Sequence, residues 1–165
     1  MSVSTLERIS DNIAQGIVEN VLTPDETNIK LPAFGPRSTD KLPMNRVGCW
    51  GENFRRASDQ MAVNPNGAYF YNHRVGRIVF EVVTQKQGDS QVGPDSVHAG
   101  AIGRIRWLMS RMAQKLVAAN IGGYEVYDVR DQGEQWSRNE ETGTDRTRLP
   151  FEFEIAIPPS GYTDS

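Results

Sequence analysis

The amino-acid sequence predicts an α+β fold: a small mixed or antiparallel sheet packed against a long amphipathic helix and an N-terminal helix, with a protruding β-hairpin arm. Three observations in the second half of the chain lead to this prediction. An apolar strand is expected at 75–84, a long helix at 95–119, and a pair of strands at 124–130 and 148–157 joined by a charged arm. We expect a single domain over residues 1–165, because a chain of this length can build one hydrophobic core.

The first predicted helix spans residues 4–22. Ser4 and Glu7 form an S-x-x-E capping box, in which each side chain can satisfy a free backbone N–H group. Apolar residues then recur at spacings of three and four, which places them on one stripe of the helix: Leu6, Ile9, Ile13, Ile17 and Val21. With Pro24 just beyond, we expect this helix to end near residue 22.

Residues 23–67 are rich in proline and are predicted to be irregular. A short strand is expected at 28–34, and Pro32 argues that it lies at an edge of the sheet because proline has no N–H to donate. We interpret 35–48 as a loop and 49–62 as a short helix or turn. The sheet-and-helix core is assigned to 68–159, and the tail at 160–165 is expected to be flexible.

The strand at 75–84 is apolar on both faces, which is typical of a central strand. Ile78, Phe80 and Val82 share one face, while Val79 and Val83 lie on the other with Glu81. The final strand instead alternates strictly, which predicts one buried and one exposed face. Its apolar side is made by Leu149, Phe151, Phe153, Ile155 and Ile157.

Asp95 or Ser96 is expected to cap the long helix, which ends near the glycines that follow Asn120. Its core-facing stripe consists of Ile102, Ile105, Met109, Met112 and Leu116. A basic stripe aligns on a different face and either is solvated or meets phosphate or an acidic partner. The basic residues are Arg104, Arg111 and Lys115. Gly100 and Gly103 predict close packing of this helix on the sheet or on a neighbouring chain.

Composition excludes several classes of protein. The net charge is −3, from 18 basic and 21 acidic residues, so the chain lacks the positive field of a general nucleic-acid binder. Cys49 is the one cysteine, so no intrachain disulfide can form, and two histidines add too few ligands for a structural zinc site. The N-terminal residues lack a signal-peptide layout, and no apolar run is long enough to span a membrane. A hydrophobic fraction of 38% suggests that burial is completed against partner chains.

Two sets of residues were weighed as catalytic candidates. His98 lies near the start of the long helix without a nucleophile nearby in sequence, so we expect a residue packed against a loop. Glu81 and Lys86 resemble the acid-and-lysine layout of metal-dependent nucleases, but their spacing does not fit one strand face. We therefore expect no catalytic residue, no cofactor and no metal site.

The arm at 131–147 is too polar to be core, yet it contains Trp136. We predict a hairpin that turns near Asn139–Gly143. Trp136 either anchors a neighbouring chain or packs back on the body, and the sequence favours neither. A second basic group in the irregular half is either solvated or part of a surface that meets a partner: Arg37, Lys41, Arg46, Arg55 and Arg56.

The order of elements resembles that of the tail terminator (tail completion, or neck) proteins of tailed bacteriophages. Three stretches carry the resemblance: SVSTLERISDNIAQGIVENVL, GRIVFEVVTQ followed by HAGAIGRIRWLMSRMAQKL, and TRLPFEFEIAIPP. It covers most of the chain and is one of layout, because that family has no short diagnostic motif.

The resemblance implies a structural virion protein, assembled in the host cytoplasm and not an enzyme. It would form a homohexameric ring at the head–tail junction that ends the tail tube. Its partners would be the tail tube protein, a neck or head-connector protein, and DNA that passes through the lumen without sequence-specific binding, with no membrane. The alternatives are a metal-dependent nuclease and a small protein-binding adaptor. Candidate contact residues are those left outside the predicted core: Arg104, Arg111, Lys115, Trp136 and Arg138.

Overall fold

The structure is a computed structural model that describes residues 9–22, 29–39, 41–56, 73–85, 93–114, 120–121 and 124–156. The elements, in chain order, are α1 (Ile9–Asn20), β1 (Ala33–Phe34), β2 (Arg46–Arg56), β3 (His73–Gln85), α4 (Ser96–Ala113), β4 (Asn120–Ile121), β5 (Tyr124–Asp131), β6 (Gln135–Asn139) and β7 (Thr144–Ala156).

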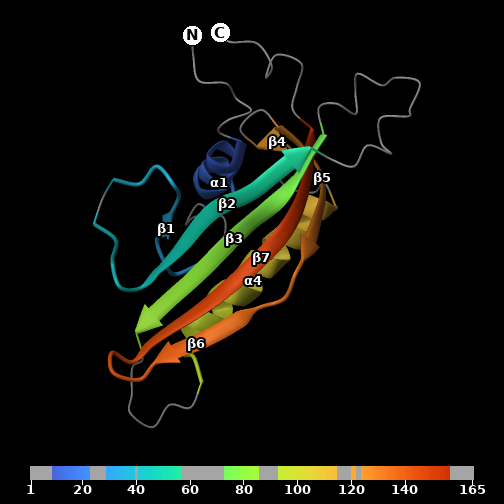
Figure 1. The fold of residues 1–165 in the computed structure, drawn as a ribbon. Helices are drawn as coiled ribbons and strands as arrows, with labels where there is room; N and C mark the ends of the chain where they lie inside the picture. The colour runs from blue at the N-terminus through green and yellow to red at the C-terminus, as the bar shows by residue number, and fades with distance from the viewer. Residues whose placement is uncertain are drawn as a thin grey trace, which may run out of the picture.

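The predicted α+β fold is confirmed. The strands form one sheet in the order β1-β2-β3-β7-β5-β4, and β6 pairs with β7. The β1–β2 pair is parallel and the other pairs are antiparallel, so the sheet is mixed. Long strands run side by side through the centre, with α4 crossing behind them and α1 beside β2 (Figure 1). β3 pairs with both β2 and β7, so its predicted central position is also confirmed.

One hydrophobic core lies between this sheet and the two helices. Phe80, Phe153 and Ile105 are each fully buried in it. The apolar stripe of α1 is buried as predicted at Ile9, Ile13, Ile17 and Val21. In α4 the predicted stripe is buried at Ile105, Met109 and Met112 and half-buried at Ile102, and on β7 the alternation holds from Leu149 to Ile155. Ser4, Glu7, Leu6, Leu116 and Ile157 lie outside the described residues.

The prediction for the middle of the chain was wrong. Residues 46–56, placed partly in a loop and partly in a short helix or turn, form the 11-residue strand β2. Val47 and Cys49 face the core, while Gly48 and Gly51 interrupt the apolar pattern that normally marks a strand. Asn53 has a φ of 59°, at the point where the register with β3 shifts. Long-range pairing with β3 therefore makes this strand, and local sequence does not.

Gly51 has a packing role that the sequence does not show. A Cβ atom at Gly51 would lie 2.7 Å from the backbone oxygen of Ser10. The absence of a side chain therefore lets the first turn of α1 approach the strand closely. This contact joins the N-terminal helix to the face of the sheet that α4 also covers.

The long helix is shorter than predicted. It begins at Ser96, with Asp95 as the N-cap, as expected, and its side chain accepts a hydrogen bond from the backbone N–H of His98 at 2.8 Å. It ends at Ala113, before the predicted end at residue 119, and Gln114 is the C-cap. The backbone N–H of Gln114 bonds to the carbonyl oxygen of Ser110 at 3.1 Å and closes the last turn. The apolar spacing continues past this cap, so spacing alone did not locate the end.

The hairpin arm is confirmed. β6 pairs with residues 144–148 of β7, and the turn lies between Asn139 and Thr144. β7 begins at Thr144, four residues before the predicted start at 148. β5 and β6 pair with successive halves of the same edge of β7, so the arm continues the sheet (Figure 1). Between them Gly133 has a φ of 92°, and the N–H of Gln132 bonds to the oxygen of Pro150.

Candidate assembly surfaces

A buried ion pair holds the two strands of the arm together next to its turn. Asp145 on β7 is fully buried and accepts hydrogen bonds from Nε and Nη2 of Arg138 at 2.8 and 3.0 Å. It also accepts a bond of 3.0 Å from the indole N–H of Trp136. Arg138 Nη2 donates further to the carbonyl oxygen of Gly93, just before α4. The arm is thereby tied both to β7 and to the segment that leads into the long helix.

The environment of Asp145 favours its charged form. Burial raises the pKa of this carboxyl group, but the hydrogen bonds from Arg138 and Trp136, together with the charge of Arg138, outweigh that effect. The pKa of Asp145 therefore lies below its ordinary value of 3.8. The ion pair persists over the whole neutral range and into mildly acidic solution.

His98 adjoins this ion pair in a buried position between two strands. Its Nδ1 lies 2.7 Å from Oγ1 of Thr84 on β3, and its Nε2 lies 2.8 Å from Oγ1 of Thr147 on β7. A neutral imidazole has one donor and one acceptor nitrogen, so His98 can donate a hydrogen bond to one threonine hydroxyl and accept one from the other. The expectation that His98 packs against a loop was wrong, because the helix start is bonded to the centre of the sheet.

The pKa of His98 is lowered from its ordinary value of 6.5, chiefly because burial penalises the charged ring, although the charges of Asp145 and Asp95 act in the opposite direction. Protonation therefore favours the unfolded chain. The stability contributed by the neutral ring is present above pH 6.5 and is lost as the pH falls from 6.5 through the folded-state pKa.

We predict that the free energy of unfolding falls as the pH is lowered below the ordinary pKa of 6.5, and that His98→Gln makes this fall shallower. Glutamine keeps one donor and one acceptor for the two threonines but does not titrate. Urea unfolding at several pH values measures the effect. An identical pH dependence in the wild type and the variant would contradict this role of His98.

A second set of ion pairs fastens the start of the arm to α4. Arg106 donates from Nε to Asp131 at 2.9 Å and from Nη1 to Glu134 at 3.0 Å. Asp131 ends β5, and Glu134 immediately precedes β6. The start of the arm is therefore attached to the long helix, while Arg138 ties the part near the turn to the segment that precedes this helix.

Trp136 shows features of both interpretations that the sequence left open. Its indole N–H is bonded to Asp145, yet 48% of the residue is exposed. Arg138 lies over the same ring, 5.6 Å from its centroid. Because the nitrogen is held in place, the exposed ring is presented in one orientation.

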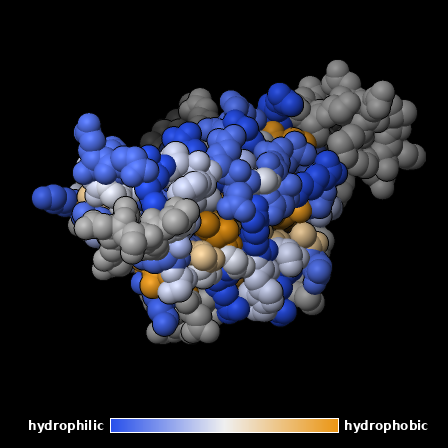
Figure 2. Space-filling view, turned by 90° about the horizontal axis from the view of Figure 1, so that it is seen from below, coloured by the Kyte–Doolittle hydropathy of each residue, from blue (hydrophilic) through white to orange (hydrophobic). Residues whose placement is uncertain are grey.

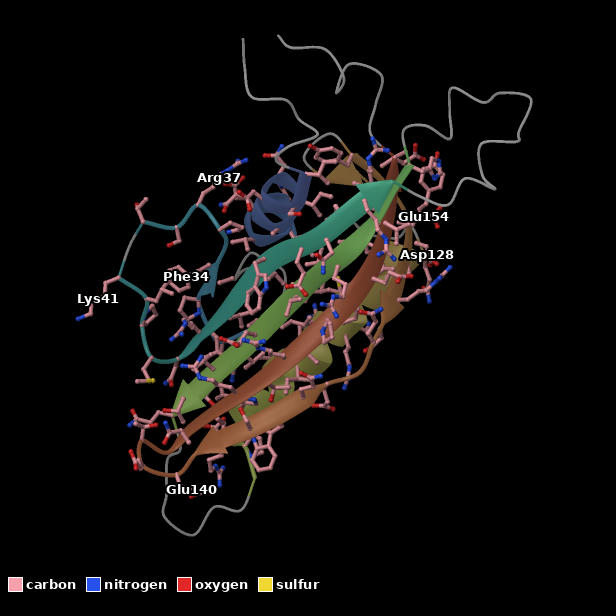
Figure 3. The ribbon with its side chains drawn as sticks, viewed as in Figure 1. Phe34, Arg37, Lys41, Asp128, Glu140 and Glu154 are labelled. Carbon is pink, nitrogen blue, oxygen red and sulfur yellow. The ribbon has the colours of Figure 1, made fainter. Side chains whose placement is uncertain are left out.

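The tip of the arm is a compact acidic turn. Oδ1 of Asn139 accepts from the backbone N–H of Glu141 at 3.0 Å, and Gly143 has a φ of 65°. Glu140 and Glu141 are exposed, and neither forms a salt bridge with a residue of the described ranges. Figure 3 places Glu140 at the far end of the hairpin. Viewed from below, this end of the molecule is mainly hydrophilic with small hydrophobic areas (Figure 2).

The outer face of α4 carries an exposed tryptophan beside two arginines. Trp107 is 43% exposed, with the guanidinium carbons of Arg104 and Arg111 lying 4.0 and 4.7 Å from its ring centroid. Arg104 and Arg111 thus lie on one face of the helix, as predicted, because both contact the ring of Trp107. Lys115, the third member of the predicted stripe, lies outside the described residues.

An open groove of about 550 Å³ runs along this face of the helix. It is lined by Lys30, Ser96, Val97, Gly100, Ala101, Gly103, Arg104 and Trp107. A Cβ atom at Gly100 or Gly103 would meet nothing within 4 Å. These glycines lie on the opposite side of the helix from the core, so of the two predicted alternatives packing on the sheet is wrong, and packing on a neighbouring chain stays a prediction.

The outer face of the sheet holds Glu81 in two ion pairs. Arg146 donates to its Oε1 at 3.0 Å and Arg148 to its Oε2 at 3.2 Å. Both carboxylate oxygens therefore have arginine partners. Lys86, the other residue of the nuclease alternative, lies outside the described part of the chain. Within the ranges that the structure describes, no group of three or more His, Cys, Asp or Glu side chains is placed to hold a metal ion.

The second basic group is dispersed and does not form one surface patch. Arg37 bonds to Asn12 on α1, and Arg46 donates to the oxygen of Pro43. Arg55 and Arg56 lie at the far end of β2. Lys41 is exposed in the loop between β1 and β2 (Figure 3).

Among the described residues, no helix is long and apolar enough to cross a membrane.

The roles of Asp145, which holds the arm, and of Thr84 and Thr147, which hold His98, were not predicted from the sequence. A usable signal was present, because the apolar alternation of the last strand occupies odd-numbered positions from Leu149 onward. Continuing that alternation backward places Thr147 and Asp145 on the buried face, where the structure has them. Their polar character led to the interpretation of this stretch as an exposed arm.

Comparison with solved structures finds a chain with this fold in a structure described as "Virion of native gene transfer agent (GTA) particle". The match covers 94% of this chain and 99% of that chain, with a TM-score of 0.53 and 13% sequence identity. No protein-family model and no curated protein matches the chain in sequence. The two chains therefore share a fold along nearly their whole lengths.

Proposed function

We propose that this chain is a structural protein of a phage-like virion that forms a ring at the head–tail junction, ends the tail tube and joins it to the neck. The observation that carries the proposal is the fold likeness, which spans nearly all of both chains, to a component of a gene transfer agent virion. The order of elements that resembles tail terminator proteins supports the more specific role.

The surfaces described above suit a protein that works by assembly. The arm projects as a rigid continuation of the sheet, and the long helix presents an exposed groove beside Trp107. In our proposal, Arg104, Arg111, Lys115 and the ring of Trp136 contact neighbouring chains. Arg138 is only 7% exposed and orients the arm from within. A hexamer would leave a lumen for DNA, with the tube protein and a head-connector protein on its two sides.

Deleting the gene in a host that produces the particles tests this role. Without a terminator, we expect heads that lack tails and free tubes of abnormal, widely varying length. Complementation with the wild-type gene should restore uniform tailed particles. Normal particles from the deletion strain, examined by electron microscopy, would contradict the proposal.

The substitution Glu81→Gln separates the structural role from the nuclease alternative. We predict normal particle assembly, because Glu81 binds Arg146 and Arg148 on the sheet and the two arginines are about half exposed. The Glu81 side chain is itself 14% exposed, but glutamine keeps an acceptor oxygen for the arginines, so the loss of stability should be about 1–2 kcal/mol. Complementation of the deletion strain measures function, and thermal unfolding measures stability. Loss of function in a fully folded Glu81→Gln chain would favour the metal-dependent nuclease.

A further inference from the structure

We propose that the acidic tip of the arm of one subunit docks in the basic groove along α4 of a second copy of this chain. The tip is the turn that carries Glu140 and Glu141. The groove is the surface lined by Lys30, Gly100, Gly103, Arg104 and Trp107. This inference rests on the proposed function as a ring protein and names the two surfaces that would join its subunits.

The groove has the features of a surface that receives a negatively charged segment. Lys30 and Arg104 line it, Arg111 lies beside it over Trp107, and no acidic residue of the described ranges lines it. Two guanidinium groups are held within 5 Å of one indole centroid. Each guanidinium group is close enough for a cation–π interaction with the indole ring, and this interaction holds both groups in position. A carboxylate brought to this face would meet pre-positioned cations, and Arg pairs with carboxylates through several parallel donors.

The two glycines add a steric argument to the charge argument. Each costs an α-helix about 1 kcal/mol relative to alanine. Since a Cβ atom at either position would enter open space, packing inside the subunit does not require glycine there. Because Gly100 and Gly103 have no side chains, the groove beside Trp107 is deeper. Another backbone can therefore approach the helix closely.

The arm tip is the segment of the described chain that best matches this groove. Its two carboxylates are exposed and form no salt bridge within the described residues. Neither glutamate lines the groove of its own subunit. The turn is held by the Asn139 side chain, and the arm is held by Asp145 and Arg106, so docking orders little additional chain.

The geometry of this contact suits a closed assembly. The tip and the groove are different surfaces of one chain, so each subunit can offer its tip to one neighbour and its groove to the other. Contacts of this heterologous type generate rings when the rotation between subunits closes. The two exposed glutamates of the tip also fit an association that depends on charge.

Charge reversal tests the contact. The tip variant carries Glu140→Lys with Glu141→Lys, and the groove variant carries Arg104→Glu with Arg111→Glu. Each is expected to weaken self-association of the full chain by about tenfold or more, because like charges then face each other. A chain with all four changes should regain most of the wild-type association. Analytical ultracentrifugation over a range of concentrations and salt measures the association constants.

Two further variants serve as controls, and one provides a test that does not involve charge. Lys41→Glu and Glu19→Lys reverse exposed charges outside both surfaces and should leave association within about threefold of the wild type. Gly103→Leu improves the helix propensity but fills the groove, so the variant should be at least as stable as the wild type yet associate more weakly. Thermal unfolding confirms that each variant is folded.

The possible results separate the two proposals. A wild-type chain that self-associates while the tip and groove variants associate equally well would overturn the docking inference and leave the ring proposal standing. Weakening by each reversal without recovery in the combined chain would also overturn it. A wild-type chain that stays monomeric at every concentration would overturn the docking inference, whereas the ring proposal would then be decided by the gene-deletion test.

Discussion

Replacing Asp145 with alanine should lower the free energy of unfolding by about 3–5 kcal/mol, because it removes one partner of a buried ion pair and leaves the other without a counter-charge. Asp145 is completely buried and receives hydrogen bonds from Arg138 and Trp136. The loss should be accompanied by detachment of β6 from the sheet. Chemical denaturation measures the stability, and amide hydrogen exchange in 135–139 reports on the arm.

Two control variants make this expectation specific. Asp145→Asn keeps an acceptor oxygen and should cost less than the alanine variant. Glu152→Ala breaks an exposed pair with Arg130 and should leave the unfolding midpoint almost unchanged. If Asp145→Ala behaved like Glu152→Ala, the buried network would not be what holds the arm.

Replacing Phe80 with alanine should also cost about 3–5 kcal/mol, because it opens a cavity in the centre of the core. Phe80 is fully buried on β3 and meets the ring of Phe151 edge-on, with centroids 5.6 Å apart. Leu42→Ala provides the matched control, since Leu42 is 45% exposed and surface truncations usually change stability by about 0.5 kcal/mol or less. Equal losses in the two variants would contradict the placement of Phe80.

The elements that sequence could predict are those with a regular apolar period. The stripe of α1, the stripe of α4 and the alternation along β7 each repeat often enough to identify the element and its buried face. The same patterns located many of the core residues, including Phe153 and Ile105. The hairpin was predictable because its flanking strands are strongly patterned and its turn contains Gly143.

The elements that sequence could not predict depend on contacts between distant residues. β2 contains Gly48, Gly51 and Asn53, and its strand conformation comes from pairing with β3 about 30 residues later. The position of His98 between Thr84 and Thr147 requires the sheet register, which no local pattern contains. Gly100 and Gly103 were noticed, but only the structure shows that they face outward.

The candidate surfaces could be predicted from the sequence only in part. Arg104 and Arg111 align as expected, yet their shared contact with Trp107 was not foreseen because Trp107 falls outside both predicted stripes. Arg138 is predicted to be a contact residue because it lies outside the predicted core. Its burial against Asp145 makes it a residue that orients the arm.

We propose that this chain forms a closed ring at one end of a tail tube. Electron cryo-microscopy of particles purified from a host that carries the gene tests it most directly. We expect a ring of this fold at the head-proximal end of the tube, with the tip of each arm against α4 of the next subunit. Particles with complete tails in which this chain is absent, or is present away from the head–tail junction, would contradict the account.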